Sequence, residues 1–412
     1  MNRVASLVVR VSAGGWFEAY DLFMTSYIAL GLYREGLFAP AGAGVSGFAS
    51  FIAAGFAGMF VGTFFFGWVS DRYGRRRTFG ASLLCYSLFT LVMSTAGTAA
   101  WVDIWRFLAG IGIGVQIITV DTYVSEVAGA ADRGKFIALS QALTFTAVPV
   151  VAALAAWLVP LDVRIGAAAV AGWRVVAALG ATGALVAPLL VRHLPETSRW
   201  SDARRLDASQ PRGWRDLFGP AYRARTLALV VVNALQVFGY YGFTSWVTTL
   251  LYQEHVTYVR SLQYTAIIAL AYPAGPLLAM WFADRLERKW QIAVLSIVVA
   301  VAGLAFGAAR LPVAIVCFGV LVSLALNWFS SAFHAYQAEL FPTAVRARAV
   351  GFVYSWSRLS SIGVGYIVSA MLALSGPTGV FAVIASAMVL VALIVGIFGP
   401  RTNRLELETI AP

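Results

Sequence analysis

A series of twelve apolar segments, separated by mostly short polar loops, constrains the fold of this chain most strongly. A transmembrane helix needs about 20 predominantly apolar residues. The segments lie at 12–33, 46–69, 78–97, 99–126, 134–160, 172–192, 226–252, 260–283, 291–308, 312–339, 349–372 and 378–399. They are continuous rather than alternating, which excludes a β-barrel. We therefore predict an all-α integral membrane protein with twelve transmembrane helices.

The distribution of charge supports a membrane protein rather than a nucleic-acid-binding one. Only 12% of residues are charged, whereas soluble domains carry about 25%. Of the 30 Lys and Arg residues, 23 lie in the two termini and in alternate loops, and four lie in the other loops. This bias is the positive-inside pattern, so we expect both termini to be cytoplasmic in a bacterial-type inner membrane. Cys85 and Cys317 both fall inside apolar segments, so no disulfide framework is implied.

The chain also contains an internal duplication. Asp71 and Glu126 are 55 residues apart, as are Asp284 and Glu339, and the two pairs are offset by 213 residues. Duplicated hydrophobic units are typical of secondary transporters. We therefore predict two pseudo-symmetric six-helix halves, at 1–192 and 226–412, joined by a polar cytoplasmic linker at 193–225.

The charged loops resemble those of the major facilitator superfamily over essentially the whole chain. The loop after the second segment reads Gly67-x-x-x-Asp71-Arg72-x-Gly74-Arg75-Arg76-Arg77, which is similar to the signature of that superfamily. The run Arg106-Phe-Leu-Ala-Gly110-Ile-Gly112 resembles its motif on helix 4. In the first segment, Glu18-Ala-Tyr20-Asp21 resembles an element of the metabolite:proton symporters and, more loosely, the paired acids of aromatic-acid:proton symporters. Sugar porters have proline where this chain has Asp121.

The resemblance implies a role for two sets of charged loop residues. In related families such sets tie helix ends together and close the cytoplasmic gate. The alternative is that the arginines only anchor topology, although this does not explain the acids. The predicted gating residues are Asp71, Arg72, Arg75, Glu126, Arg133, Asp284, Arg285, Glu339 and Arg346.

Acidic residues inside the segments are candidates for proton coupling. Glu18 and Asp21 are three residues apart and share one face of the first helix. A carboxylate near the bilayer centre costs about 2.5–3.5 kcal/mol even on the mildest scale, so each should face a cavity or a partner. We predict that at least one of them carries the proton, with Asp21 ahead, and the alternative is a permanent ion pair with Arg106. Asp121 is a further candidate, or a locally paired structural acid.

Two arginines inside the segments are candidates for substrate binding. The depth of Arg106 on the fourth helix lets its side chain reach Asp21. It is either the counter-ion of the acids of the first helix or a bidentate clamp on a substrate carboxylate. Arg358 has no acid nearby in sequence, which favours an anionic partner, although a backbone carbonyl or a cytoplasmic acid is an equal alternative.

Polar stripes lie on the two helices that the resemblance places at a central cavity, the seventh and the tenth. They either bind substrate or hold helices together. The residues assigned to binding on these helices are Asn233, Gln236, Tyr240, Tyr241, Trp246, Asn327 and His334.

We predict a secondary active transporter that works by alternating access and imports a small organic acid, preferably an aromatic or heteroaromatic monocarboxylate, with a proton. The alternatives are a proton-coupled drug or metabolite exporter, a sugar or polyol porter, and a sensor that binds without transport. An enzyme is the least favoured class, because no nucleophile–base set appears. We expect no metal, no cofactor and no nucleic-acid partner, and a monomer whose partners are its substrate, protons and lipid.

Overall fold

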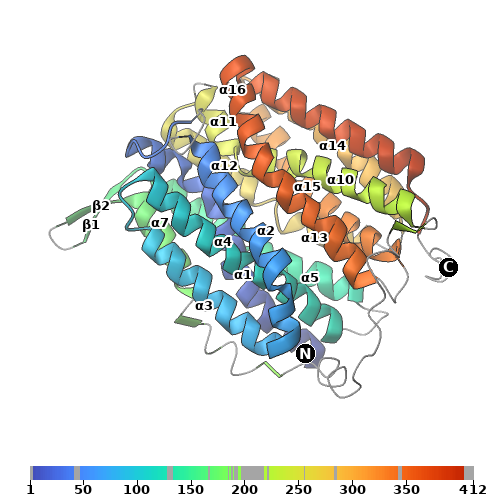
Figure 1. Cartoon of the computed structure of the whole chain (residues 1–412). Coiled ribbons are helices and arrows are strands. Elements are labelled where there is room, and N and C mark those ends of the chain that lie inside the picture. Colours follow the sequence, from blue (N-terminus) through green and yellow to red (C-terminus); the bar gives the residue numbers. More distant parts are fainter. Residues whose placement is uncertain are drawn as a thin grey trace.

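A computed structural model of the chain describes residues 3–40, 47–127, 133–165, 168–183, 185–186, 189, 194–195, 218–219, 222–254, 256–282, 285–341 and 346–402. Within its helices, the side chains at 65–72, 117–118, 121–122, 125–126, 133–134, 338 and 346–348 lie outside that description, as do a few others. The described helices form a single bundle (Figure 1).

The N-terminal half contains seven labelled helices. They are α1 (Arg3–Arg34), α2 (Phe48–Tyr73), α3 (Arg75–Met93), α4 (Ala99–Val127), α5 (Arg133–Phe145), α6 (Ala147–Leu158) and α7 (Gly172–Gly180). Each of the six apolar segments predicted in this half contains at least one of these helices, because in a bilayer only a helix satisfies the backbone of such a segment internally.

The C-terminal half repeats this arrangement. It contains α10 (Arg223–Thr244), α11 (Val247–Gln253), α12 (Tyr258–Ala269), α13 (Ala274–Phe282), α14 (Arg288–Ala308), α15 (Pro312–Glu339) and α16 (Arg346–Phe398). The label α16 covers two helices, because the backbone at Gly376 is non-helical (φ 66°) and Pro377 follows it. Among the described helices, six satisfy both the length and the apolarity needed to cross a membrane. All twelve predicted apolar segments nevertheless contain helix, so the predicted all-α architecture of twelve spans is confirmed.

Proline accounts for two breaks that divide predicted single helices. The segment 134–160 is divided at Thr146 into α5 and α6, three residues before Pro149. The segment 260–283 is interrupted by turns at 270–273, which end at Pro273. Proline has no amide hydrogen and its ring clashes with the preceding helical turn, so each break lies just before or at the proline.

A short β-hairpin was not predicted from the sequence. Strands β1 (Asp162–Ile165) and β2 (Ala168–Ala171) are antiparallel, with Asp162 opposite Ala171. The hairpin lies at the opposite end of the bundle from the start of α1 and the end of α16 (Figure 1). Arg34, at the end of α1, forms a 2.9 Å ion pair with Asp162 and so fixes the hairpin to the first helix. We call this end of the bundle the far side, and the other end the termini side.

Glycines bring α2 and α4 into backbone contact. A Cβ atom on Gly58 would lie 2.0 Å from the carbonyl oxygen of Phe107, and one on Gly110 would lie 2.4 Å from that of Gly55. No larger residue fits at either position, and small residues are the usual means by which membrane helices approach closely. This packing fixes the depth and orientation of Arg106, whose Nε lies next to Gly55.

Candidate functional site

A cavity of about 120 Å³ lies between the two halves. Its walls come from α1, α4 and α5 of the first half and from α10, α15 and α16 of the second. Aromatic rings form much of the surface, including Phe23, Phe145 and Phe333. Its charged and strongly polar side chains are Glu18, Gln141, Gln236, His334 and Arg358.

Arg358 supplies the positive charge of this cavity. Its guanidinium is 2% exposed and donates one hydrogen bond to the hydroxyl of Tyr241 at 2.5 Å and another to the hydroxyl of Tyr354 at 2.8 Å. Its Nε has no hydrogen-bond partner among the described residues. The ring of Tyr354 also contacts the guanidinium at 5.0 Å and the ring of His334 at 5.0 Å. The direct partners of this cation in the described part of the chain are therefore neutral.

Glu18 supplies the negative charge. Its side chain is 8% exposed and lies on the wall of the cavity, within electrostatic range of Arg358. Glu18 belongs to α1 and Arg358 to α16, so the two charges face the cavity from opposite halves. Of the two alternatives expected for a buried acid, a cavity or a partner, Glu18 has the cavity, and its role in proton coupling stays a prediction.

Asp21 is placed differently, although it lies on the same helix. It is fully buried, and Arg106 Nη1 bonds its Oδ1 at 2.6 Å. Thr90 donates to its Oδ2 at 2.5 Å. The other guanidinium nitrogen, Nη2, donates to the carbonyl oxygen of Asp21 at 3.2 Å and to Thr25 at 2.7 Å. Arg106 thus reaches Asp21, as its depth in the helix predicts, and the pair lies beside the cavity rather than on its wall.

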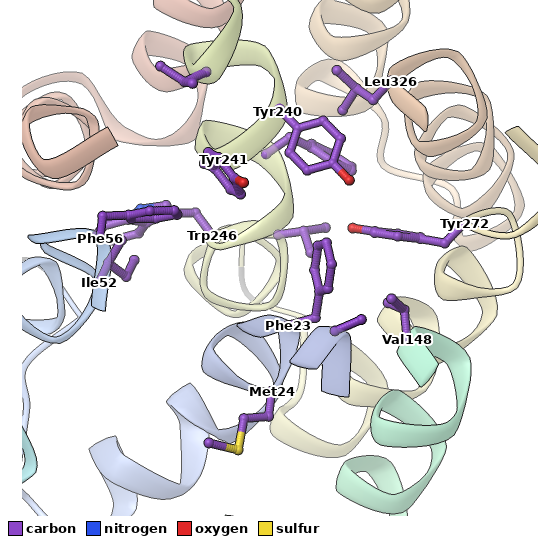
Figure 2. Close-up of a cluster of buried hydrophobic side chains, with 14 of the residues drawn as sticks. Phe23, Met24, Ile52, Phe56, Val148, Tyr240, Tyr241, Trp246, Tyr272 and Leu326 are labelled. Carbon is purple, nitrogen blue, oxygen red and sulfur yellow. The ribbon is translucent and has the colours of Figure 1, made fainter. Parts of the chain in front are cut away.

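An aromatic layer separates this ion pair from the cavity. A second, water-sized cavity of about 10 Å³ is lined by Arg106 and Thr25, and it shares Leu22, Phe23 and Tyr241 with the larger one. Figure 2 shows Phe23 pointing between the tyrosines of α10 and Tyr272. The ring centroids of Phe23 and Tyr272 are 5.3 Å apart. The two arginines therefore lie on opposite sides of one aromatic partition.

Besides Arg106, three of the predicted binding residues do not line the larger cavity. Asn233 donates to Gln337 at 2.8 Å, which joins α10 to α15. Asn327 accepts a 3.0 Å hydrogen bond from the hydroxyl of Tyr240 and thereby orients that ring. Trp246 is fully buried against Phe48, with ring centroids 5.4 Å apart. Their side chains are occupied by contacts between helices, which was the alternative interpretation of the polar stripes.

Three hydrogen bonds between the two halves lie on the far side of the cavity. They are Ser26 to Thr248 at 3.3 Å, Tyr33 to Thr249 at 2.9 Å, and the Tyr258 hydroxyl to the Val159 carbonyl at 3.2 Å. Next to the cavity itself, Ser331 donates to Gln141 at 2.7 Å and joins α15 to α5. The far ends of the halves are therefore in contact.

On the termini side, the second charged set differs in part from the prediction. Glu339 pairs with Arg288, which the prediction did not include. Arg285 instead lies over the ring of Trp281 at 4.7 Å. Burial raises the pKa of the Glu339 carboxyl, and the nearby Arg288 opposes this effect. Glu339 is the last residue of α15, so its charge lies at the end of the helix.

Several predicted residues lie outside the described part of the chain or have side chains that do. These are Asp71, Arg72, Asp121, Glu126, Arg133, Asp284 and Arg346. Arg75 begins α3, and its side chain is partly buried. The gating roles assigned to this set stay predictions.

The fold and the central cavity define a class of polytopic membrane proteins with two six-helix halves around one site, which is the architecture of secondary transporters. The family profile described as Major Facilitator Superfamily matches residues 12–277 and 263–410. The chain belongs to this superfamily and is a multi-pass integral membrane protein.

Relatives and solved structures agree with this assignment. The chain is 29% identical to the putative metabolite transport protein YyaJ of Bacillus subtilis, over 94% of this chain and 90% of that protein. It is 27% identical to the niacin transporter NiaP of Acinetobacter baylyi, over 97% and 94% of the two chains. A crystal structure of a D-xylose–proton symporter is 20% identical and superimposes with a TM-score of 0.76, covering 98% of this chain and 99% of the other. At that identity the structural match shows the fold alone.

Proposed function

We propose that this protein imports a small monocyclic aromatic or heteroaromatic monocarboxylate together with a proton, across a bacterial-type inner membrane, as a monomer with both termini in the cytoplasm. The observation that carries the proposal is Arg358, a buried cation on the cavity wall whose described hydrogen-bond partners are two neutral hydroxyls. A guanidinium binds a carboxylate through two parallel, charge-assisted hydrogen bonds. The hydroxyls of Tyr241 and Tyr354 accept hydrogen bonds from Nη1 and Nη2, the two nitrogens that would donate to such a carboxylate.

The size and surface of the cavity support a single ring. A cavity of about 150 Å³ accommodates benzene, so this cavity of about 120 Å³ is too small for two rings and must widen even for one ring with a carboxylate. Phe23, Phe145 and Phe333 offer apolar contact to a ring, and aromatic pairs gain about 0.5–1.5 kcal/mol beyond the burial of area. A disaccharide or a bulky drug would require the walls to separate.

The names of several relatives support the same class of substrate. Besides the niacin transporter, the chain is 28% identical to a cis,cis-muconate transport protein of Acinetobacter baylyi. It is 26% identical to a 3-(3-hydroxy-phenyl)propionate transporter of Escherichia coli. Niacin and hydroxyphenylpropionate carry one ring and one carboxylate, and muconate is an open-chain diacid. The feature common to all three is a carboxylate.

Proton coupling is assigned to the two acids of α1. Glu18 faces the cavity, where neutralisation by a proton would leave Arg358 as the uncompensated charge of the site and so favour an anion. Protonation of Asp21 would weaken its pair with Arg106 beside the partition. A monocarboxylate that crosses with one proton carries no net charge, so the pH gradient drives its accumulation, by about tenfold for each pH unit.

Uptake into proteoliposomes tests the proposal. Purified protein is reconstituted, a pH gradient is imposed, and accumulation is measured for aromatic acids, aliphatic acids, sugars and cationic drugs. We expect accumulation of aromatic monocarboxylates that a protonophore abolishes and that empty liposomes do not show. Accumulation of sugars alone, or of cations in exchange for protons, would replace this proposal with a neutral-solute porter or an exporter.

A further inference from the structure

A stripe of hydroxyl side chains runs along α3. Thr78, Ser82, Tyr86 and Thr90 recur every four residues and therefore share one helix face. All four are buried, and Tyr86 and Thr90 are fully so. At a rise of 1.5 Å per residue, the stripe extends over about 18 Å of the helix. Hydroxyls at membrane depth are costly unless they bind a partner, so a continuous row of them needs an explanation.

One end of the stripe holds the buried acid. Thr90 donates its 2.5 Å hydrogen bond to Asp21, the carboxylate that pairs with Arg106. Ser82 is hydrogen-bonded to the side chain of Gln116. In contrast, the hydroxyls of Thr78 and Tyr86 are buried and have no hydrogen-bond partner among the described residues. A buried hydroxyl without a partner loses about 1–3 kcal/mol, so both groups are suited to binding water.

Tyr86 lies at the level of the second acid. α1 and α3 run in the same direction, because Thr90 contacts Asp21 and Phe79 lies against Gly14. Moving toward the termini side, Tyr86 is about 6 Å from Thr90 along α3, and Glu18 is about 4.5 Å from Asp21 along α1. The phenol is within electrostatic range of both acids. Among the described residues, Arg106 of α4 pairs with Asp21 at one end of the stripe, and Arg75, Arg76 and Arg77 begin α3 at the other end.

The stripe does not border the substrate cavity. None of its four residues lines either cavity that contains an arginine of the site. A proton that moved along the stripe would reach Asp21 without passing the position of the substrate.

We propose that the α3 hydroxyl stripe is the path by which the proton passes between Asp21 and the termini side, with Tyr86 as its central link. The inference rests on the proposed proton coupling. Successive residues of the stripe are about 6 Å apart along the helix axis, and in this proposal one water molecule between neighbouring hydroxyls completes each step. A proton leaves the Asp21 carboxyl, each hydroxyl or water accepts one proton and releases another, and the excess proton emerges as hydronium near Thr78. Asp21 regains its negative charge and its pair with Arg106, and no hydroxyl of the stripe stays charged.

Tyr86→Phe is the direct test, because it removes one oxygen and keeps the ring. The matched control is Ser87→Ala, which removes a neighbouring hydroxyl that is also buried without a described partner but lies off the stripe, next to Phe17 and Gly183. Both variants and the wild type are reconstituted in proteoliposomes. Two rates are compared with an aromatic monocarboxylate: pH-gradient-driven uptake, recorded with an internal pH dye, and exchange of labelled for unlabelled substrate at equal pH.

We expect Tyr86→Phe to slow proton-driven uptake by about tenfold or more while exchange continues at the wild-type rate. Ser87→Ala should leave both rates unchanged. Thr78→Val repeats the test at the termini end of the stripe, and thermal stabilisation by the substrate checks that each variant is folded. If Tyr86→Phe and Thr78→Val take up substrate at the same rate as the wild type, the proposed path is wrong and the proposed proton coupling still stands. Wild-type uptake that ignores the pH gradient overturns the proposed coupling, and the path with it.

Discussion

Replacement of Arg358 should remove the preference for an acid over its amide. Each hydrogen bond to a charged group contributes about 1.5–3 kcal/mol, which corresponds to about 10- to 150-fold in affinity. Arg358→Gln should therefore weaken binding of an aromatic monocarboxylate by that factor. The corresponding amide, which carries no charge, should lose much less. Arg358→Lys should be intermediate, because it keeps the charge but lacks the planar fork.

The assay is equilibrium binding of the acid, its amide and its methyl ester to purified protein, measured by calorimetry or by ligand-induced thermal stabilisation. Tyr354→Phe is the matched control, since it removes a neutral partner of the guanidinium and retains the cation. Because the described hydrogen-bond partners of Arg358 are neutral, its replacement should leave no directly paired buried charge behind. The unliganded protein should therefore keep most of its thermal stability. An equal loss of affinity for acid and amide, or unchanged binding of the acid, would refute Arg358 as the carboxylate site.

Three further outcomes follow from the buried and terminal charges. Glu18→Gln and Asp21→Asn should each abolish pH-gradient-driven accumulation in proteoliposomes but retain substrate exchange; if both accumulate substrate as the wild type does, the proton site is elsewhere. Arg106→Gln should cost about 3–5 kcal/mol of stability, because it leaves the buried Asp21 charge unpaired, and adding Asp21→Asn should restore part of the lost thermal stability; additive losses would contradict a coupled pair. Burial raises the pKa of Glu339, so its contribution to the free energy of unfolding is greatest below about pH 4.3, its ordinary value, and falls as pH rises through the raised pKa. The free energy of unfolding, measured by denaturation at a series of pH values above about 4.3, should fall less steeply with pH for Glu339→Gln than for the wild type. Identical slopes would contradict the raised pKa.

The fold was predictable from the sequence because the bilayer limits the choice to long apolar helices. The prolines at 149 and 273 also mark the helix breaks, although the apolar pattern runs through them. The β-hairpin at 162–171 was not predictable in the same way. Its strands are four residues long and lie between two predicted apolar segments. The length and apolarity that predict the helices therefore say nothing about them.

The site was predictable only where one half of the chain contains both partners. The depths of Asp21 and Arg106 along two neighbouring helices were enough to predict their contact. Helical spacing could not separate Gln236, which lines the cavity, from Asn233, which joins two helices. Likewise, the placement of Glu18 opposite Arg358 depends on how the halves dock, and no local pattern encodes that arrangement. Gln141 and Tyr354 were missed for the same reason.

The positions of the two acids of α1 limit how proton and substrate can be coupled. Glu18 faces the cavity, whereas Asp21 lies behind the partition formed by Leu22, Phe23 and Tyr241. Two of these three partition residues directly follow Asp21 on α1, so a shift of this helix moves the acid and the cavity wall together. Under the proposed coupling, protonation of Asp21 would weaken the contact that fixes α1 against Arg106, and the part of the cavity wall that belongs to α1 would move with the helix. The proposed coupling through α1 requires that substrate and proton bind at separate positions, so a substrate that replaces the tyrosine hydroxyls on Arg358 should still depend on Asp21 for accumulation.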